Sequence, residues 1–441
     1  MSERRGTVFI TASWERINLR AGLQGFIKGL GARRTVAPPE RRLGREAKVS
    51  LLIHSFFQFG ASMSGVFLNL YLWRLTESIW VNGMYNIINY AVAPFAFMLG
   101  GWLAKKTDRM YSYRLGLLLI SAFYICVVAA QELVAEWYPV FAVFASLSSA
   151  FYWVGYLVLM YDVSDERNRI HYLAMNSIFF TLAGLVGPAL AGRVIALNDG
   201  LHGYIIVFGI AFFMFLLAAV GSLKIKAKPS RHKAYYLKHT LLMMKRSPEW
   251  MRGLWGFFAM GLLQGIMLFL PNILLYQVMP REDHIGYMSV LFSLITIAMG
   301  MLISRFAKTE HTTLYLWISG GGLIAAASLL LAGLSLWSVI SFMVLYSFFN
   351  PLQGNTLTSH YYNHVGKLPL KGNFRVESVV LRETFLNAGR VISIVVLILL
   401  LQEVAGRQLA FILLGGAVCQ LILPMLIGQK SAGTKRQAGR A

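Results

Sequence analysis

Acidic residues are scarce in this chain of 441 residues, and charged residues of all kinds make up only 14% of it. Soluble domains usually carry about 25% charge, so this shortage argues against a soluble protein. Only two cysteines occur, Cys126 and Cys419, and both lie inside apolar runs. They read as small buried side chains rather than a disulfide framework. Apolar residues fill 57% of the chain instead, and the mean hydropathy is +0.58.

Several catalytic signatures are missing as well. The chain has no Gly-x-x-x-x-Gly-Lys-Ser/Thr loop, which argues against an ATP-driven pump, and no His-Glu-x-x-His or Gly-x-Ser-x-Gly motif. His360 and His364 stand one helical turn apart, but no third metal ligand accompanies them. We therefore expect no catalytic residue, no metal site and no cofactor.

Long apolar runs recur along the whole chain. A helix needs roughly 20 such residues to cross the hydrocarbon core of a bilayer, and charged or turn-forming residues divide the runs into twelve segments. These are 49–73, 80–104, 114–133, 138–161, 175–193, 202–223, 250–277, 285–306, 313–333, 335–357, 383–403 and 408–428. The sequence thus predicts an all-α integral membrane protein with twelve transmembrane helices.

The twelve segments form two sets of six with a basic stretch between them. The first set covers 48–223 and the second 250–428, nearly equal lengths that an internal duplication would produce. We predict two pseudo-symmetric six-helix bundles joined by a cytoplasmic linker, 224–249. A basic cytoplasmic segment, 1–47, would precede them, and a cytoplasmic tail, 429–441, would follow.

The segment before the first span has no apolar core followed by a cleavage site, so we expect no signal peptide there. Within it, apolar residues recur at helical spacing over 16–30, beside basic ones. This stretch is either an amphipathic helix on an anionic membrane surface or a disordered basic tail.

The net charge of +22 fits membrane orientation better than nucleic-acid binding. With both termini in the cytoplasm, all but four of the 41 Lys and Arg residues fall on the cytoplasmic side. The exceptions are Arg74, Arg193, Arg281 and Arg407. This bias is the one that the positive-inside rule describes, so we predict a multi-pass protein of the cell membrane. We expect no nucleic-acid partner and a monomeric state.

Two motifs resemble those of the major facilitator superfamily. Residues 100–109, Gly-Gly-Trp-Leu-Ala-Lys-Lys-Thr-Asp-Arg, look like the loop between the second and third helices of that family. Asp108 and Arg109 would supply its charge pair and act in gating or coupling. Lys105, however, stands in the usual acidic place.

The second motif is Gly-Leu-Val-Gly-Pro-Ala-Leu-Ala-Gly at 184–192, which resembles the Gly-Pro motif of the family's proton-coupled exporters. Gly187 and Pro188 would bend this helix, because proline removes one backbone hydrogen bond. The alternative is an ordinary Gly-Pro pair in a membrane helix.

The resemblance implies a pore between the halves, lined by segments one, four, seven and ten. Polar or aromatic residues recur at helical spacing on one face of each. They are Gln58, Ser62 and Asn69; Ser149, Trp153 and Tyr156; Gln264 and Asn272; and Tyr346, Asn350 and Gln353. These faces either line the substrate pathway or hydrogen-bond neighbouring helices.

Two further stripes suggest gating or coupling. They are Asn82, Asn86 and Asn89 in segment two, and Glu383, Asn387 and Arg390 in segment eleven. If segment eleven starts at Glu383, Arg390 lies about 10 Å inside the membrane, where a charge needs a substrate group or an acidic partner. Glu383 would then help to set its charge environment. Alternatively the helix starts later, and Arg390 snorkels to the surface.

Together these features predict a secondary active transporter that moves a small solute by alternating access, coupled to protons or another ion. Aromatic lining with few fixed charges favours a hydrophobic or amphipathic substrate, and the Gly-Pro motif favours export. One alternative is a flippase of the same fold that moves a lipid or glycolipid. The other is a membrane-embedded transferase that uses Asp162, Asp165 and Glu166. Membrane lipids would surround the protein in each case.

Overall fold

The computed structural model describes residues 43–163, 169–226, 235–307, 309–365, 375–401 and 407–428, and these are helical apart from short turns. The predicted amphipathic stretch at 16–30 and the tail from 429 lie outside the described residues. So do Asp165 and Glu166 of the transferase hypothesis.

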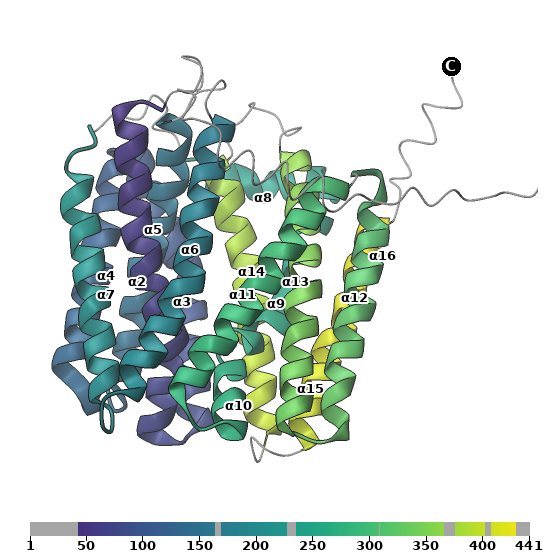
Figure 1. The fold of residues 1–441 in the computed structure, drawn as a ribbon. Helices are drawn as coiled ribbons and strands as arrows, with labels where there is room; N and C mark the ends of the chain where they lie inside the picture. Colours follow the sequence, from purple (N-terminus) through teal and green to yellow (C-terminus); the bar gives the residue numbers. More distant parts are fainter. Residues whose placement is uncertain are drawn as a thin grey trace, which may run out of the picture. The chain divides into compact units, whose positions relative to one another are not determined.

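Six spanning segments precede the linker (Figure 1). They are α2 (Arg45–Thr76), α3 (Ile79–Lys106), α4 (Arg109–Ala130) with η2 (Gln131–Val134), α5 (Tyr138–Asp162), α6 (Arg169–Ala196) and α7 (His202–Ser222). A short helix, α8 (Leu237–Arg246), lies within the predicted linker 224–249.

Six more segments complete the chain. They are α9 (Pro248–Met267) with α10 (Leu270–Val278), α11 (Glu282–Phe306), α12 (Thr312–Ser328) with η4 (Leu329–Ala332), α13 (Leu336–Val365), α14 (Arg375–Leu400), and α15 (Arg407–Val418) with η5 (Cys419–Leu421) and α16 (Ile422–Gly428). Eleven of the twelve segments are apolar and long enough to cross a membrane. The remaining one, α13, has 30 residues and includes a polar stripe. The prediction of an all-α protein with twelve transmembrane helices is confirmed.

Two predicted boundaries were too short. Helix α13 continues to Val365, eight residues past its predicted end, and α14 begins at Arg375, eight residues before its predicted start. Both extensions are polar turns, which hydropathy does not mark as spanning although they continue the helix.

The helices present apolar side chains on their outer surfaces. Phe95, Trp337 and Leu399 are all more than 70% exposed. Contiguous exposed apolar surface of this kind is typical of contact with lipid. Polar residues are placed instead at helix starts, where the side chain of Ser78 accepts a hydrogen bond from the backbone N–H of Val81.

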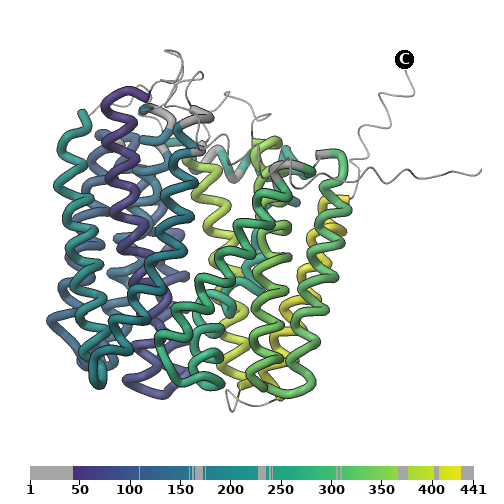
Figure 2. The backbone as a smooth tube through the Cα atoms, viewed as in Figure 1, coloured from purple at the N-terminus to yellow at the C-terminus, as the bar shows by residue number. Residues whose placement is uncertain are grey.

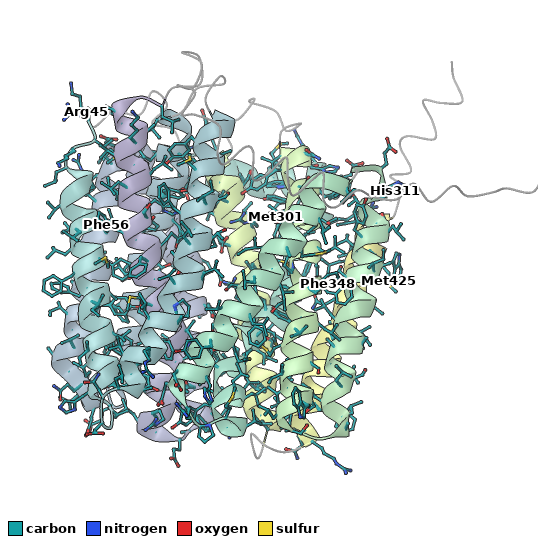
Figure 3. All side chains as sticks on the ribbon, in the orientation of Figure 1. Arg45, Phe56, Met301, His311, Phe348 and Met425 are labelled. Atoms are coloured by element: carbon teal, nitrogen blue, oxygen red, sulfur yellow. The ribbon has the colours of Figure 1, made fainter. Side chains whose placement is uncertain are left out.

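Each set of helices packs mainly with its own members (Figure 2). In the first set α2 packs on α6 and α7, and α4 packs on α5 and α7; in the second, α9 packs on α14 and α12 on α13. Two long contacts join the sets, α6 with α11 and α3 with α14. The two ends of the bundle are the Arg45 end and the Thr76 end, after the first and last residues of α2. His311 also lies at the Arg45 end (Figure 3).

The seventh segment is broken in two. Helix α9 ends at Met267 and α10 begins at Leu270. Pro271 lies in the first turn of α10 and has no N–H to donate to the carbonyl four residues earlier. The break leaves Gln264 on α9, and it leaves Asn272 and Tyr276 on α10.

Candidate substrate pathway

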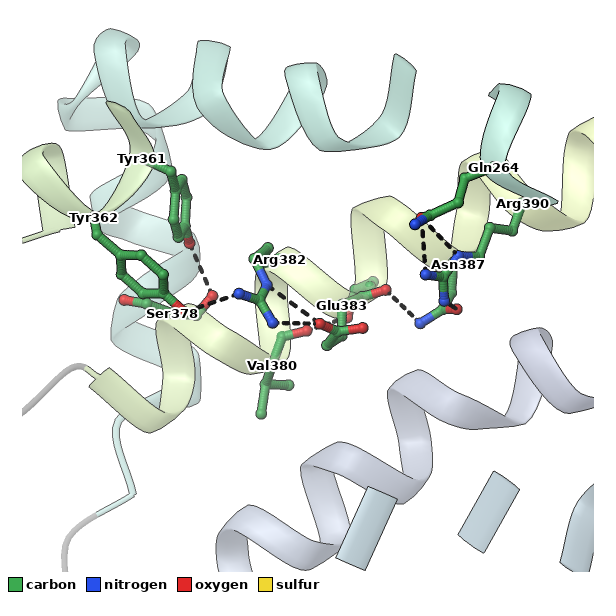
Figure 4. A network of polar contacts seen from close by, with 10 residues as sticks. Gln264, Tyr361, Tyr362, Ser378, Val380, Arg382, Glu383, Asn387 and Arg390 are labelled. Carbon is green, nitrogen blue, oxygen red and sulfur yellow. Dashed lines mark hydrogen bonds and ion pairs between the residues drawn. The ribbon is translucent and has the colours of Figure 1, made fainter. Parts of the chain in front are cut away.

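Helix α14 carries the polar stripe of Glu383, Asn387 and Arg390 (Figure 4). Because the helix begins at Arg375, Arg390 lies about 22 Å along it at 1.5 Å per residue. The alternative of a later start, with Arg390 snorkelling to the near surface, is therefore wrong. Arg390 lies well inside the spanning part of the chain.

Two amide oxygens hold the guanidinium of Arg390. Its Nε and Nη2 donate to Oε1 of Gln264 at 3.3 and 2.9 Å, and its Nη1 donates to Oδ1 of Asn387 at 2.9 Å. The group also lies 5.1 Å from the ring centre of Tyr90 on α3, an arrangement that stabilises a cation. Within the described ranges, no carboxylate forms an ion pair with Arg390.

Glu383 neutralises a different arginine. Its Oε1 accepts from Nη2 and Nε of Arg382 at 2.6 and 3.2 Å, and Arg382 also donates to the hydroxyl of Tyr362 at 2.8 Å (Figure 4). The link from Glu383 to Arg390 is indirect, through Asn387, whose Nδ2 donates to the Glu383 carbonyl at 2.8 Å. Arg382 and Arg390 thus differ: among the described residues, the first has a carboxylate partner, and the second hydrogen-bonds only to amides.

A glycine brings α9 and α14 close enough for these bonds. A Cβ at Gly265 would lie 2.7 Å from the Cα of Arg390 and 2.5 Å from Oγ of Ser393, so only glycine fits at this crossing. The close approach places Gln264, the residue before Gly265, beside the Arg390 side chain.

The face of α14 that carries Arg390 points away from lipid. Ile392, Val395, Val396 and Leu399 are between 37% and 74% exposed. Counted at about 100° per residue, they lie on the opposite side of the helix from Arg390. Arg390 itself is partly buried, so its remaining accessible atoms face the interior of the helix bundle.

Aromatic residues of α2 and α5 form the corresponding region in the first set. Nδ1 of His54 lies 2.5 Å from the Tyr152 hydroxyl, and its ring stacks on Tyr156 at 4.0 Å between centroids. Trp153 meets the His54 ring edge-on at 6.3 Å. Gln58, one turn further along α2, is buried, and its Nε2 has no hydrogen-bond partner among the described residues. The structure thus brings these predicted residues of segments one and four together.

The asparagine stripe of α3 is engaged in bonds between helices. Nδ2 of Asn86 donates to Oδ1 of Asn69 on α2 and to the carbonyl of Asn82, both at 2.9 Å. The carbonyl of Asn89 accepts from Oγ of Ser146 on α5 at 2.8 Å. The Asn86 amide thus joins α3 to α2 and the Asn89 backbone carbonyl joins it to α5, and a role of the stripe in gating stays a prediction.

The predicted stripe residues of α13 lie in two different environments. Gln353 is only 1% exposed, and its Nε2 donates to Oε1 of Gln420 at 2.9 Å. It therefore binds a neighbouring helix of its own set in this arrangement. Tyr346 and Asn350 are partly buried, as is Ser149 of α5.

An ion pair joins the two sets at the Thr76 end. Arg74, in the last turn of α2, pairs with Glu282, at the start of α11. The Tyr204 hydroxyl donates to the same carboxylate at 3.2 Å, and Arg74 lies 5.1 Å from the ring centre of Tyr276. Nearby on α10, Nδ2 of Asn272 donates to a carbonyl of α2 at 3.3 Å.

A second ion pair joins the sets at the Arg45 end. Lys105, near the end of α3, pairs with Glu377, in the first turn of α14, whose side chain is fully buried. The backbone N–H of Tyr236 donates to the same carboxylate at 2.9 Å. Burial and the negative charge of Glu377 raise the pKa of the Tyr235 hydroxyl, so this neighbour stays protonated and neutral.

Sequence reasoning missed Glu282 and Glu377 as partners. A signal for the second existed, because a lysine in the acidic place of the loop motif calls for an acid on the facing helix. Asp108 instead caps α4 by accepting from the backbone N–H two residues on, at 3.1 Å. The side chain of Arg109 lies outside the described part.

The Gly-Pro motif lies at a crossing of helices. Pro188 is inside α6, and a Cβ at Gly187 would lie 2.8 Å from that of Ser62 on α2. Helix α6 also packs along α11 of the second set. The motif therefore occupies a contact between the halves.

Known proteins resemble the chain in sequence. The sequence model described as "Major Facilitator Superfamily" matches residues 50–368. YqgE of Bacillus subtilis (strain 168) is 28% identical over 368 residues, which cover 83% of this chain and 85% of YqgE. A protein encoded in the sodM 3′ region of Geobacillus stearothermophilus is 28% identical over 169 residues, covering 38% of this chain and 79% of that protein.

Solved transporter structures resemble the chain in fold. A D-xylose–proton symporter gives a TM-score of 0.67 at 11% identity, covering 86% of this chain and 96% of its own. The nucleoside transporter NupG gives 0.65 at 14% identity, covering 87% and 99%. A bacterial homologue of the iron transporter ferroportin, in an inward-facing state, gives 0.64 at 15%, covering 87% and 99%. At these identities the likeness concerns the fold alone.

Proposed function

Since the chain belongs to the Major Facilitator Superfamily and is therefore a multi-pass membrane transporter rather than an enzyme, we propose that it moves an amphipathic or hydrophobic small solute across the cell membrane by alternating access. The proposal includes proton coupling, export as the direction of transport, a monomeric state and cytoplasmic termini. It also takes 48–223 and 250–428 as the two moving bundles.

The observation that carries the proposal is the pair of ionic contacts at opposite ends of the same two bundles. Arg74 pairs with Glu282 at the Thr76 end, and Lys105 pairs with Glu377 at the Arg45 end. Alternating access requires that the halves part at one end while they stay joined at the other. Two separate ionic contacts, each across the halves, suit this requirement.

The substrate class rests on the side chains between the two ends. Trp153, Tyr156 and Tyr346 offer aromatic surface, with Gln58 as an unpaired amide. Sites for small ligands usually combine apolar walls with a few polar groups that fix orientation. An amphipathic solute matches that combination.

Proton coupling requires a group that can change its charge along the pathway. Glu383 suits this role, because protonation of its carboxylate would release Arg382 from the ion pair at 2.6 Å. His54 on α2, whose Nδ1 lies beside the Tyr152 hydroxyl, is another titratable group. Export rests on the Gly187–Pro188 motif of α6.

Purified protein in proteoliposomes tests the proposal. A panel of amphipathic solutes should include at least one whose flux rises when a proton gradient is imposed. Glu383→Gln should abolish this dependence on the gradient while solute exchange at equal pH continues. The protein inserts into liposomes in both orientations. Selective inactivation of the molecules in one orientation leaves flux through the others, and the sign of that flux gives the direction of transport. A panel without any protein-dependent flux would count against the function.

A lipid or glycolipid substrate is the second candidate. The observation that favours it is an apolar pocket of about 320 Å³ between α2, α6 and α7, lined by Phe56, Phe59, Phe179 and Leu182 among others. A pocket of this kind suits an acyl chain. Protein-dependent movement of a fluorescent lipid between leaflets, measured by quenching from one side, would select this candidate.

A further inference from the structure

Among the residues that the structure describes, no carboxylate pairs with Arg390, a cation in the spanning part of the chain. Its guanidinium has five N–H donors, and three of them bond to Gln264 and Asn387. Two N–H groups remain, the number that a carboxylate accepts from an arginine in a bidentate pair. We propose that Arg390 is the anchor for the carboxylate of an amphipathic anionic substrate. This proposal rests on the transport function proposed above and names its substrate class.

The position of Arg390 gives a ligand access to it. Its side chain lies on the side of α14 opposite to the lipid-exposed residues, and it is partly accessible in the bundle interior. It also lies where three helices meet, since Gln264 belongs to α9 and Tyr90 to α3. A solute held at Arg390 therefore contacts both halves, as a substrate of alternating access must.

The surroundings favour an apolar or aromatic body behind the carboxylate. The ring of Tyr90 lies beneath the guanidinium. A single arginine, with no second cation bonded beside it in the described part of the chain, suits a monoanion, because a phosphate dianion would leave negative charge unpaired.

Energetics separate this role from a purely structural one. A charge inside the membrane is expensive unless it is paired, and amide oxygens supply hydrogen bonds without neutralising it. A structural arginine would gain from a carboxylate in place of the Gln264 amide. An anion-binding arginine would gain the same stability but lose its ligand, since the new carboxylate would neutralise the guanidinium in place of the substrate's carboxylate.

Gln264→Glu is therefore the decisive variant, because it is nearly isosteric and places a carboxylate beside Arg390. Asn387→Asp makes the same change from the other contact. Gln264→Met is the matched control, since it removes the same amide without adding charge. Arg390→Met removes the cation.

The assay is binding by purified full-length protein. The probes are 4-phenylbutyrate, 4-phenylbutanamide and 4-phenylbutylammonium, which share one apolar body and differ in charge. Hydrogen bonds to a charged group typically contribute about 1.5–3 kcal/mol, which corresponds to roughly 10- to 150-fold in affinity. We expect the wild type to bind the carboxylate at least about tenfold more tightly than the amide or the ammonium. Gln264→Met removes the amide and adds no charge, so it should weaken carboxylate binding yet retain more of this preference than Gln264→Glu.

Gln264→Glu, Asn387→Asp and Arg390→Met should lose the preference while remaining folded, and the first two should melt at or above the wild-type temperature. Equal or undetectable binding of the three probes by the wild type would overturn the proposal. So would an unchanged preference for the carboxylate in Gln264→Glu. These outcomes are separate from failure of the transport function, which shows as absent protein-dependent flux for every solute in the proteoliposome panel.

Discussion

Replacing Glu377 with glutamine removes the negative charge that holds α14 to α3 at the Arg45 end of the bundle. The change keeps the shape of the side chain, and it keeps an oxygen that can accept from the backbone N–H of Tyr236. What is lost is the charge opposite Lys105. We expect this end of the bundle to part more readily in the variant.

The size of the effect follows from burial. The Glu377 side chain is 0% exposed and that of Lys105 is 11% exposed, so the pair is screened little by solvent. Removing one partner of a buried pair costs about 3–5 kcal/mol. Lys105 also lies 5.7 and 5.6 Å from the ring centres of Tyr235 and Tyr236, which keep part of its stabilisation. The lower figure applies, and about 3 kcal/mol is roughly a hundredfold in the opening equilibrium.

A cysteine at Val380 measures this opening. Val380 is 0% exposed and packs in a cluster of α3, α5 and α14 residues between the halves. In a background without Cys126 and Cys419, the reaction of Val380→Cys with an aqueous thiol reagent should accelerate at least tenfold when Glu377→Gln is added. Leu381→Cys is the matched control, because Leu381 packs within the second set and should stay protected in both backgrounds.

Reversing the pair tests the cause. Lys105→Glu combined with Glu377→Lys should restore slow labelling of Val380→Cys, since the attraction returns with opposite sign. The reasoning is refuted if Glu377→Gln leaves the labelling rate of Val380→Cys unchanged, or if Leu381→Cys accelerates equally.

Three further outcomes are expected. When an impermeant thiol reagent is applied to intact cells, a cysteine at Glu136 should be labelled. A cysteine at Lys228 should be labelled only after the membrane is made permeable. Gly265→Val should lower the melting temperature, because the added atoms meet the backbone of α14 and overpacking typically costs about 1–3 kcal/mol; Gly265→Ala should lower it less. Glu282→Gln weakens the contact with Arg74, so the Thr76 end should open more often, and a cysteine at the buried Ala191 near that end should label faster.

The spanning segments could be predicted because hydropathy is a local property. The same signal failed at the entry of α14, where Glu377 pairs with Lys105 of α3, and Arg382 contacts Glu383 and Tyr362. These turns continue the helix through backbone bonds that do not depend on apolarity. For this reason α14 begins eight residues before its predicted start.

The candidate site was predicted one helix at a time. Helical spacing placed Glu383, Asn387 and Arg390 on one face, and the structure keeps Asn387 and Arg390 together. The helix that faces them is α9, because the two helices cross closely at Gly265. The spacing of residues within α14 does not encode this crossing. Pairing across 272 positions, as between Lys105 and Glu377, likewise depends on the assembled bundle. Glu383 was expected to help set the charge environment of Arg390, and its pairing with Arg382 was not predicted because adjacent residues share no helical face.

The break between α9 and α10 separates two contacts that a continuous helix would move together. Gln264, which holds Arg390, comes before the break, and Tyr276, which lies against Arg74, comes after it. Because Pro271 leaves the hydrogen-bond ladder incomplete at this point, a movement of α10 at the Thr76 end need not move α9. If Arg390 holds the substrate, as proposed, opening of that end would leave its contacts with the solute unchanged. The residence time of the solute would then be set at Arg390, and a tightly held compound would stall the transport cycle with the Thr76 end open.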